Sequence, residues 1–176
     1  MNWIKLEHLL LKAEPGRAVT ADPQLDHAQL REQALRLAAG LQTRGVRRIA
    51  VHLEDAADLA IALLGAWRAG VSVLLPADLQ PQTRQRWSGE VDLWLTDQPD
   101  DTHPGDYQDA PLGAAALDLD GCSLSLCTSG SSGEPKRIEK NLRQLANEVQ
   151  ALEQLWGADL GPACIIGSVA TQHIYG

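Results

Sequence analysis

Residues 46–76 read VRRIAVHLEDAADLAIALLGAWRAGVSVLLP, and this stretch indicates the fold of the chain. Val46–Leu53 is typical of a strand. The next segment has acidic residues in its first turn, Arg68 in its last turn and Gly70 after it, which is typical of a helix. A short apolar run then ends at Pro76. Strand, helix and strand in this order predict two parallel strands joined by a helix that covers the sheet.

The same alternation continues on both sides of this stretch. Upstream, apolar residues recur at helical spacing and predict a helix from about Asp26 to Arg44. Downstream, PQTRQRWSG is expected to form one or two helical turns. The remaining predicted elements are strands at Val91–Thr96, Ser123–Cys127 and Ala163–Ala170, and a helix from Leu142 to about Trp156. We therefore expect an α/β fold with a mostly parallel sheet flanked by helices.

The bulk composition is that of one cytoplasmic domain. A chain of 176 residues is long enough for a single core, and no internal repeat divides it. The formal net charge of −8 disfavours a general binder of nucleic acid or of anionic membranes. The N-terminal sequence MNWIKLEHLLLKAEPG has too short an apolar run for a signal peptide or a membrane span. It favours a short amphipathic helix instead.

Residues 97–121 differ in composition from the rest of the chain, with seven acidic residues and no lysine or arginine. A solvated surface loop is favoured here over an acidic interaction tail.

The three cysteines have no CxxC spacing. Cys122 and Cys127 are five residues apart, and an odd separation in a strand places them on opposite faces. For these two and Cys164, buried free thiols are favoured over a metal site or a disulfide. A reducing compartment agrees with that interpretation.

The segment LCTSGSSGEPKRIEKNLRQL, Leu126–Leu145, places a glycine-rich turn between a predicted strand and a predicted helix. Glycines let backbone N–H groups converge on an anion, hydroxyl groups add donors, and a following helix can direct its N-terminus at the same anion. The hydroxyl residues are Thr128, Ser129, Ser131 and Ser132, the glycines are Gly130 and Gly133, and the positive charge is Lys136 after Pro135. These residue types predict a nucleotide-phosphate loop, with a flexible Gly/Ser surface loop as the alternative.

Two common phosphate motifs are absent from this turn. Walker A needs lysine and then Ser or Thr directly after its last glycine, whereas Gly133 is followed by Glu134 and Pro135. The GxGxxG fingerprint of dinucleotide folds is absent as well. The turn does lead into the dense basic cluster of the chain, which consists of Lys136, Arg137, Lys140 and Arg143.

The turn TSGSSGEPK, Thr128–Lys136, resembles the phosphate loop of the adenylate-forming superfamily, which reads roughly [ST]-[SG]-G-[ST]-[ST]-G-x-P-K. That superfamily includes acyl- and aryl-CoA synthetases, luciferases and peptide-synthetase adenylation domains. Ala62–Pro76 is similar to an early segment of the family, and TQHIYG, Thr171–Gly176, is similar to a later one. Three positions depart from the family pattern, namely Glu134, Arg137 and Leu142, although Asn141 beside the last can still cap a helix.

The resemblance implies that the parent enzyme activates a carboxylic acid, aryl or fatty acyl, with ATP and Mg²⁺. The acyl-adenylate then passes its acyl group to the thiol of CoA or of a carrier protein. Lys136 and His173 are the implied catalytic residues, with Lys136 and the loop hydroxyls on the β- and γ-phosphates and His173 near the substrate carboxylate. The implied nucleotide-binding residues are Thr128, Ser129, Gly130, Ser131, Ser132, Gly133 and Lys136, and no metal ligand is implied in this chain.

The resemblance also implies that residues 1–176 are a partial N-terminal AMP-binding domain without the family's mobile C-terminal domain. We expect this piece to lack full catalysis by itself and to self-associate through exposed edges. The alternative is a non-catalytic nucleotide- or partner-binding module that keeps the phosphate loop.

Overall fold

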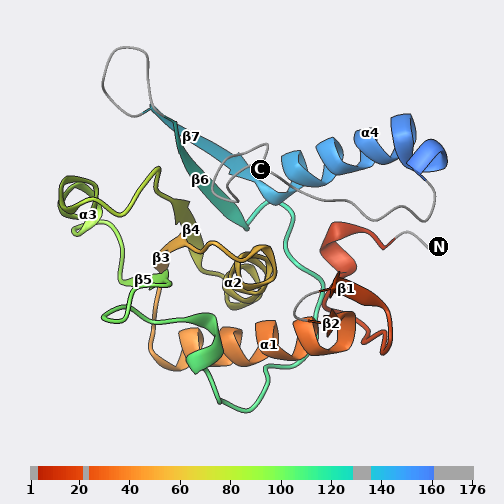
Figure 1. Ribbon diagram of the computed structural model, residues 1–176, viewed down its shortest axis with the longest axis horizontal. Helices are drawn as coiled ribbons and strands as arrows, with labels where there is room; N and C mark the ends of the chain where they lie inside the picture. Colours follow the sequence, from red (N-terminus) through yellow and green to blue (C-terminus); the bar gives the residue numbers. More distant parts are fainter. Residues whose placement is uncertain (1–3, 22–23, 129–135, 161–176) are drawn as a thin grey trace.

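The computed structural model describes residues 4–21, 24–128 and 136–160, whose main element is a five-stranded sheet (Figure 1). The strand order is β5-β3-β4-β6-β7. The strands are β3 (Arg48–His52), β4 (Ser72–Leu75), β5 (Leu93–Thr96), β6 (Ser123–Thr128) and β7 (Lys136–Asn141). The first four in spatial order are parallel, and β7 pairs antiparallel with β6 at the edge. The predicted α/β fold with a mostly parallel sheet is confirmed.

The first three helices begin and end close to the predicted positions, whereas the last one begins at Leu142 as predicted but continues four residues beyond Trp156. The helices are α1 (His27–Thr43), α2 (Ala56–Ala69), α3 (Pro81–Trp87) and α4 (Leu142–Leu160). α1 starts with a capping box, in which the Asp26 carboxylate accepts from the Gln29 N–H at 2.9 Å and the Gln29 side chain accepts from the Asp26 N–H. α2 ends at Gly70, whose φ of 75° suits glycine.

The two faces of the sheet carry apolar clusters of different size. The main core lies between one face and the helices α1 and α2, and it includes Ile49 and Val51 of β3. The opposite face carries a smaller cluster of Ala50, Leu74 and Trp87, the last at the end of α3. This division follows from the strand geometry, because consecutive residues of β3 point to opposite faces.

The N-terminal region departs from the prediction. The expected amphipathic helix is a single 3-10 turn, η1 (Leu6–His8). An antiparallel hairpin of β1 (Ala18–Ala21) and β2 (Gln24–Asp26) follows, which the sequence analysis did not identify. Both strands are short and largely exposed, so no apolar run marks them in the sequence.

Residues 97–121 form a largely exposed loop, as predicted, but the loop is attached to the core at a few buried positions. The segment contains η2 (Pro104–Asp106), and its Tyr107 and Leu117 are buried in the main core. The Leu117 N–H donates to the Glu7 carbonyl at 2.9 Å, which joins the segment to the N-terminal region. The predicted surface loop is therefore confirmed for most of the segment, and the apolar side chains of Tyr107 and Leu117 attach it to the core.

The described cysteines are free thiols, as predicted, and Cys122 is buried whereas Cys127 is only half-buried. Cys122 belongs to the main core and Cys127 packs against the smaller cluster, so they lie on opposite sides of the sheet. Burial raises the pKa of the Cys122 thiol to about 11. Cys164 and the predicted strand Ala163–Ala170 lie outside the described residues.

α4 is anchored in its first turn, where Leu145 also packs against the main core, and is largely exposed after it. Leu142 is buried in the core, where its N–H donates to the Cys122 carbonyl at 3.0 Å. Large apolar side chains further along the helix remain exposed, namely Val149, Leu152, Leu155, Trp156 and Leu160. No helix among the described residues has the length and apolar character needed to cross a bilayer.

Candidate functional site

The ends of the predicted phosphate loop are held together by the β6–β7 hairpin. Thr128, the last residue of β6, lies opposite Lys136, the first residue of β7. β6 is parallel to β4, so the loop leaves the sheet at the carboxyl ends of these strands. In open α/β sheets, ligands bind in the crevice outside these ends. The predicted residues Ser129, Gly130, Ser131, Ser132, Gly133 and His173 lie outside the described residues.

The structure corrects one part of the phosphate-loop prediction, because no helix follows the loop directly. β7 intervenes, and its six residues extend about 20 Å at the usual rise of an antiparallel strand. α4 therefore starts at the other end of the hairpin, where Asn141 lies opposite Ser123. Asn141 caps α4, as predicted, by accepting from the Gln144 N–H at 3.0 Å. The N-terminus of α4 is too far away to bind an anion in the loop.

The basic cluster after the loop is dispersed and neutralised. Arg137 donates to Glu90 at 2.8 Å and forms an ion pair with Glu139 at 2.9 Å. The other pairs are Lys140 with Glu148 and Arg143 with Asp120. Lys136 is exposed at the loop end. The cluster is therefore no continuous cationic patch, and Lys136 is the basic residue placed beside the loop.

A pocket of about 240 Å³ lies beside the start of the loop. It is lined by Ala77, Asp78, Gln82, Thr83, Arg86, Trp87 and Cys127. Ala77 and Asp78 follow β4, and Cys127 is the penultimate residue of β6, so the pocket opens at the carboxyl ends of these strands. The sequence analysis did not identify this pocket. The available signal was a polar residue, Asp78, directly after a buried strand.

Asp78 and Thr83 shape the polar side of this pocket. The Asp78 Oδ1 accepts from the Gln80 N–H at 3.0 Å and from the Thr83 hydroxyl at 2.5 Å. These bonds hold the Asp78 carboxylate at the start of α3. Burial raises the pKa of the Cys127 thiol on the apolar side, although the Arg137 and Arg86 guanidinium groups act in the opposite direction.

A second polar group lies at the carboxyl ends of β3 and β5. The His103 Nε2 is 3.4 Å from an Asp58 carboxylate oxygen and 3.7 Å from one of Asp97. Its Nδ1 accepts from the Gly105 N–H at 3.1 Å, so the neutral ring carries its proton on Nε2. Desolvation raises the pKa of Asp58, and His103 opposes that rise. Across the described ranges, no three His, Cys, Asp or Glu side chains form a group that could hold a metal.

Another groove is separate from the loop. It has a volume of about 450 Å³ and lies between α1 and the segment around η2. Its lining includes Glu32, Arg36 and Tyr107 but no residue of β6 or β7. The pocket beside the loop is therefore the better candidate for chemistry linked to the phosphate motif.

The sequence is similar to parts of large synthetases, while no family model matches it. It is 32% identical over 157 residues to phenyloxazoline synthase MbtB of Mycolicibacterium paratuberculosis, covering 79% of this chain and 13% of that protein. It is 31% identical over 153 residues to pyochelin synthetase PchE of Pseudomonas aeruginosa, covering 78% of this chain and 11% of that protein. The chain thus spans about one eighth of the length of these relatives.

The fold is similar to that of solved adenylating enzymes. The Bacillus subtilis O-succinylbenzoate coenzyme A synthetase MenE in complex with ATP and magnesium superposes with a TM-score of 0.64 at 18% identity, covering 86% of this chain and 46% of that chain. The N-terminal subdomain of Klebsiella oxytoca NpsA, bound to 3-hydroxybenzoyl-AMSN, superposes with a TM-score of 0.55 at 21% identity. That match covers 70% of this chain and 36% of the NpsA chain.

Proposed function

Because the chain belongs to the adenylate-forming superfamily and has the fold of its N-terminal subdomain, we propose that it supplies the phosphate loop for ATP-dependent activation of a carboxylic acid. The observation that carries this proposal is the position of the motif. TSGSSGEPK spans the β6–β7 turn, with Thr128 in register with Lys136 at the carboxyl edge of the sheet. A triphosphate placed at this edge would lie beside the Lys136 ammonium group.

In the proposed reaction, the substrate carboxylate attacks the α-phosphorus of ATP. A bond forms between carboxylate oxygen and phosphorus, and the bond to the bridging oxygen of pyrophosphate breaks. Lys136 and the hydroxyl and N–H groups of the loop would neutralise the charge that gathers on the leaving β- and γ-phosphates. His173 would lie near the carboxylate as a wall of the acyl pocket.

Magnesium suits this site as a companion of the phosphates. Mg²⁺ typically takes one or two carboxylates together with substrate phosphates and waters, rather than an all-protein cage. Among the described residues, Asp78 beside the loop could supply one such carboxylate. The ion would shield the negative charge of the triphosphate when bound.

The proposed acid is aryl or fatty acyl, and the acceptor is the thiol of CoA or of a carrier protein. MenE is a coenzyme A synthetase, and the NpsA subdomain is bound to a 3-hydroxybenzoyl ligand. These neighbours support an aryl acid for this chain.

Carboxylate-dependent ATP–pyrophosphate exchange tests the proposal, with aryl, fatty and amino acids as substrates. Lys136→Ala should lower exchange by roughly 10²–10³-fold, the scale for one lost transition-state contact. Lys140→Ala is the matched control, because Lys140 lies on the same strand and pairs with Glu148. Equal exchange in the Lys136 variant and the unmodified protein would rule out the assigned role.

A second function is a nucleotide- or partner-binding module without catalysis. It would need only the phosphate motif at the β6–β7 turn, with Lys136 at its end. ATP binding without exchange for any acid would support this second function. Exchange with one class of acid would support the first.

A further inference from the structure

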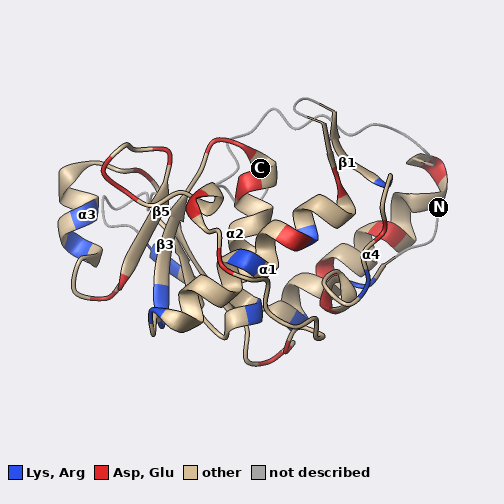
Figure 2. Ribbon diagram, turned by 90° about the horizontal axis from the view of Figure 1, so that it is seen from below, with Lys and Arg blue, Asp and Glu red and all other residues tan. Residues whose placement is uncertain are grey.

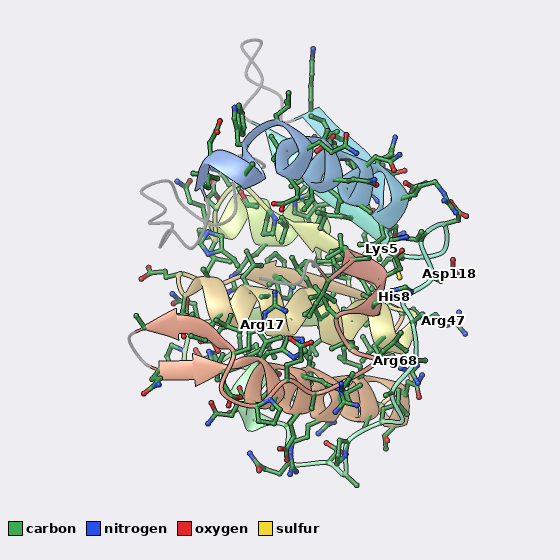
Figure 3. All side chains as sticks on the ribbon, turned by 90° about the vertical axis from the view of Figure 1, so that its right-hand side faces the viewer. Lys5, His8, Arg17, Arg47, Arg68 and Asp118 are labelled. Atoms are coloured by element: carbon green, nitrogen blue, oxygen red, sulfur yellow. The ribbon has the colours of Figure 1, made fainter. Side chains whose placement is uncertain are left out.

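Arg86 stands apart from most arginines of the protein in having no acidic partner. Within residues 4–21, 24–128 and 136–160, only Arg47 and Arg86 form neither an ion pair nor a hydrogen bond through the guanidinium group. Arg47 precedes β3 at the amino edge of the sheet, on the side where Arg68 and Asp118 also lie (Figure 3). Arg86 lines the pocket beside the phosphate loop.

The exposed Arg86 side chain lies over the ring of Trp87. The Arg86 guanidinium carbon is 5.6 Å from the centre of the Trp87 ring, and that of Arg137 is 5.9 Å from the same ring. Trp87 is only 7% exposed, so the indole is a fixed surface for both cations. The basic residues of α3 are visible as blue bands on this helix in Figure 2.

Neighbouring acids are already bound by other arginines. Glu90 pairs with Arg48 at 3.1 Å and with Arg137 at 2.8 Å. Asp101 pairs with Arg84. The positive charge of Arg86 is consequently the one at this pocket that no described carboxylate neutralises.

The lining of the pocket includes one carboxylate, that of Asp78. The Asp78 Oδ1 accepts two hydrogen bonds, and no described residue donates to its Oδ2. A guanidinium and a carboxylate in one small pocket are complementary to a phosphate that carries a magnesium ion, with guanidinium on phosphate oxygens and carboxylate towards the cation. A volume of about 240 Å³ is below the usual range for pockets that enclose a drug-sized ligand, and so favours a small ion over a whole nucleotide.

We infer that this pocket binds pyrophosphate, with Arg86 as the phosphate-binding residue and Asp78 facing the accompanying magnesium ion. The inference rests on the proposed function, because adenylation is the reaction that releases pyrophosphate at the adjacent loop. The pocket then receives the leaving group after the bond to the α-phosphorus has broken. In the reverse direction, Arg86 retains pyrophosphate for attack on the acyl-adenylate.

Titration calorimetry with inorganic pyrophosphate, with and without Mg²⁺, tests the inference directly. We expect Arg86→Gln to weaken pyrophosphate binding at least tenfold, and Arg86→Lys to retain part of the affinity. Arg47→Gln is the matched control, because it removes the same charge from an arginine at the opposite edge of the sheet, and it should change affinity less than twofold. Asp78→Asn should reduce the gain in affinity that Mg²⁺ brings.

The outcomes separate this inference from the proposed function. If Lys136→Ala abolishes exchange while Arg86→Gln binds pyrophosphate normally, adenylation stands and the inference is overturned. Equal losses in the Arg86 and Arg47 variants would mean a general charge effect and would also overturn it. If pyrophosphate binding falls only in the Arg86 variant while no acid supports exchange, the pocket assignment holds and the proposed adenylation fails. Binding of benzoate but not of pyrophosphate in the same calorimetric titrations would assign the pocket to a carboxylate instead and refute the inference.

Discussion

Replacing Gly65 with alanine perturbs the contact between α1 and α2. A Cβ at this position would lie 2.8 Å from the carbonyl oxygen of Ala34 and 2.9 Å from a methyl carbon of Leu37. The carbonyl belongs to the backbone of α1 and cannot rotate away. The two helices must therefore move apart by a few tenths of an ångström, which disturbs packing in the main core.

Two opposing effects determine the size of the change. Alanine is favoured over glycine inside a helix by up to about 1 kcal/mol. Overpacking of a close-packed core costs typically about 1–3 kcal/mol. Because the clash is with backbone, we expect the packing cost to exceed the gain in helix propensity. Gly65→Ala should lower the free energy of unfolding by about 1–2 kcal/mol.

Gly157 offers a control with the same substitution and the opposite expected sign. A Cβ there would meet the carboxylate group of Glu153, the end of an exposed and flexible side chain on α4. Gly157→Ala should therefore raise the free energy of unfolding by up to about 1 kcal/mol.

Urea unfolding followed by tryptophan fluorescence measures both variants. The free energies are comparable if the unfolding slopes agree with that of the unmodified protein. A Gly65→Ala variant as stable as the unmodified protein, or more stable, would refute the close α1–α2 contact.

Three further predictions concern charge, thiol reactivity and association. The Arg84 guanidinium, assisted by the Thr96 hydroxyl, lowers the pKa of Asp101. The stability that this pair contributes is therefore fully present above the pKa of an unfolded carboxyl group, near 4. It is lost as the pH falls through the lower pKa of the folded state. Asp101→Asn should cost about 1–2 kcal/mol at pH 7 and less at pH 3, and equal losses at both pH values in urea titrations would contradict the pairing. Cys122 has a pKa of about 11 and is 4% exposed, so its thiol should react with a disulfide reagent at pH 7 far more slowly in the folded protein than after unfolding. The reaction rate is measured in a variant whose other cysteines are replaced by serine. Fast labelling of the folded protein would exclude the burial of Cys122. Leu155 is 67% exposed on the apolar side of α4, so we expect the protein to self-associate at high concentration. Leu155→Glu should shift the sedimentation of the protein towards that of a monomer. Identical sedimentation of the variant and the unmodified protein would reject α4 as the contact.

The sequence predicted those elements that contribute a periodic apolar face to the core. α1 and α2 combine helical spacing with Asp26 and Asp55 as N-caps and Gly70 at the end of α2, so local and tertiary preferences agree. β7 was missed because it lies at the edge of the sheet and alternates charged residues, without an apolar run. That omission led to the incorrect expectation that a helix N-terminus follows the loop.

By itself, the sequence determined the chemical identity of the candidate site. TSGSSGEPK specifies glycines, hydroxyl groups and a lysine in an order that depends on adjacent residues only, so it can be recognised without a fold. The pocket depended on the tertiary structure, because it combines Asp78 after β4, Arg86 on α3 and Cys127 on β6, which lie up to 49 positions apart in the chain. Whether an arginine finds an acid is likewise decided by long-range packing. Arg137 reaches Glu90 across the fold while Arg86 remains beside Trp87, and only the folded chain determines which of the two is left to bind an anion.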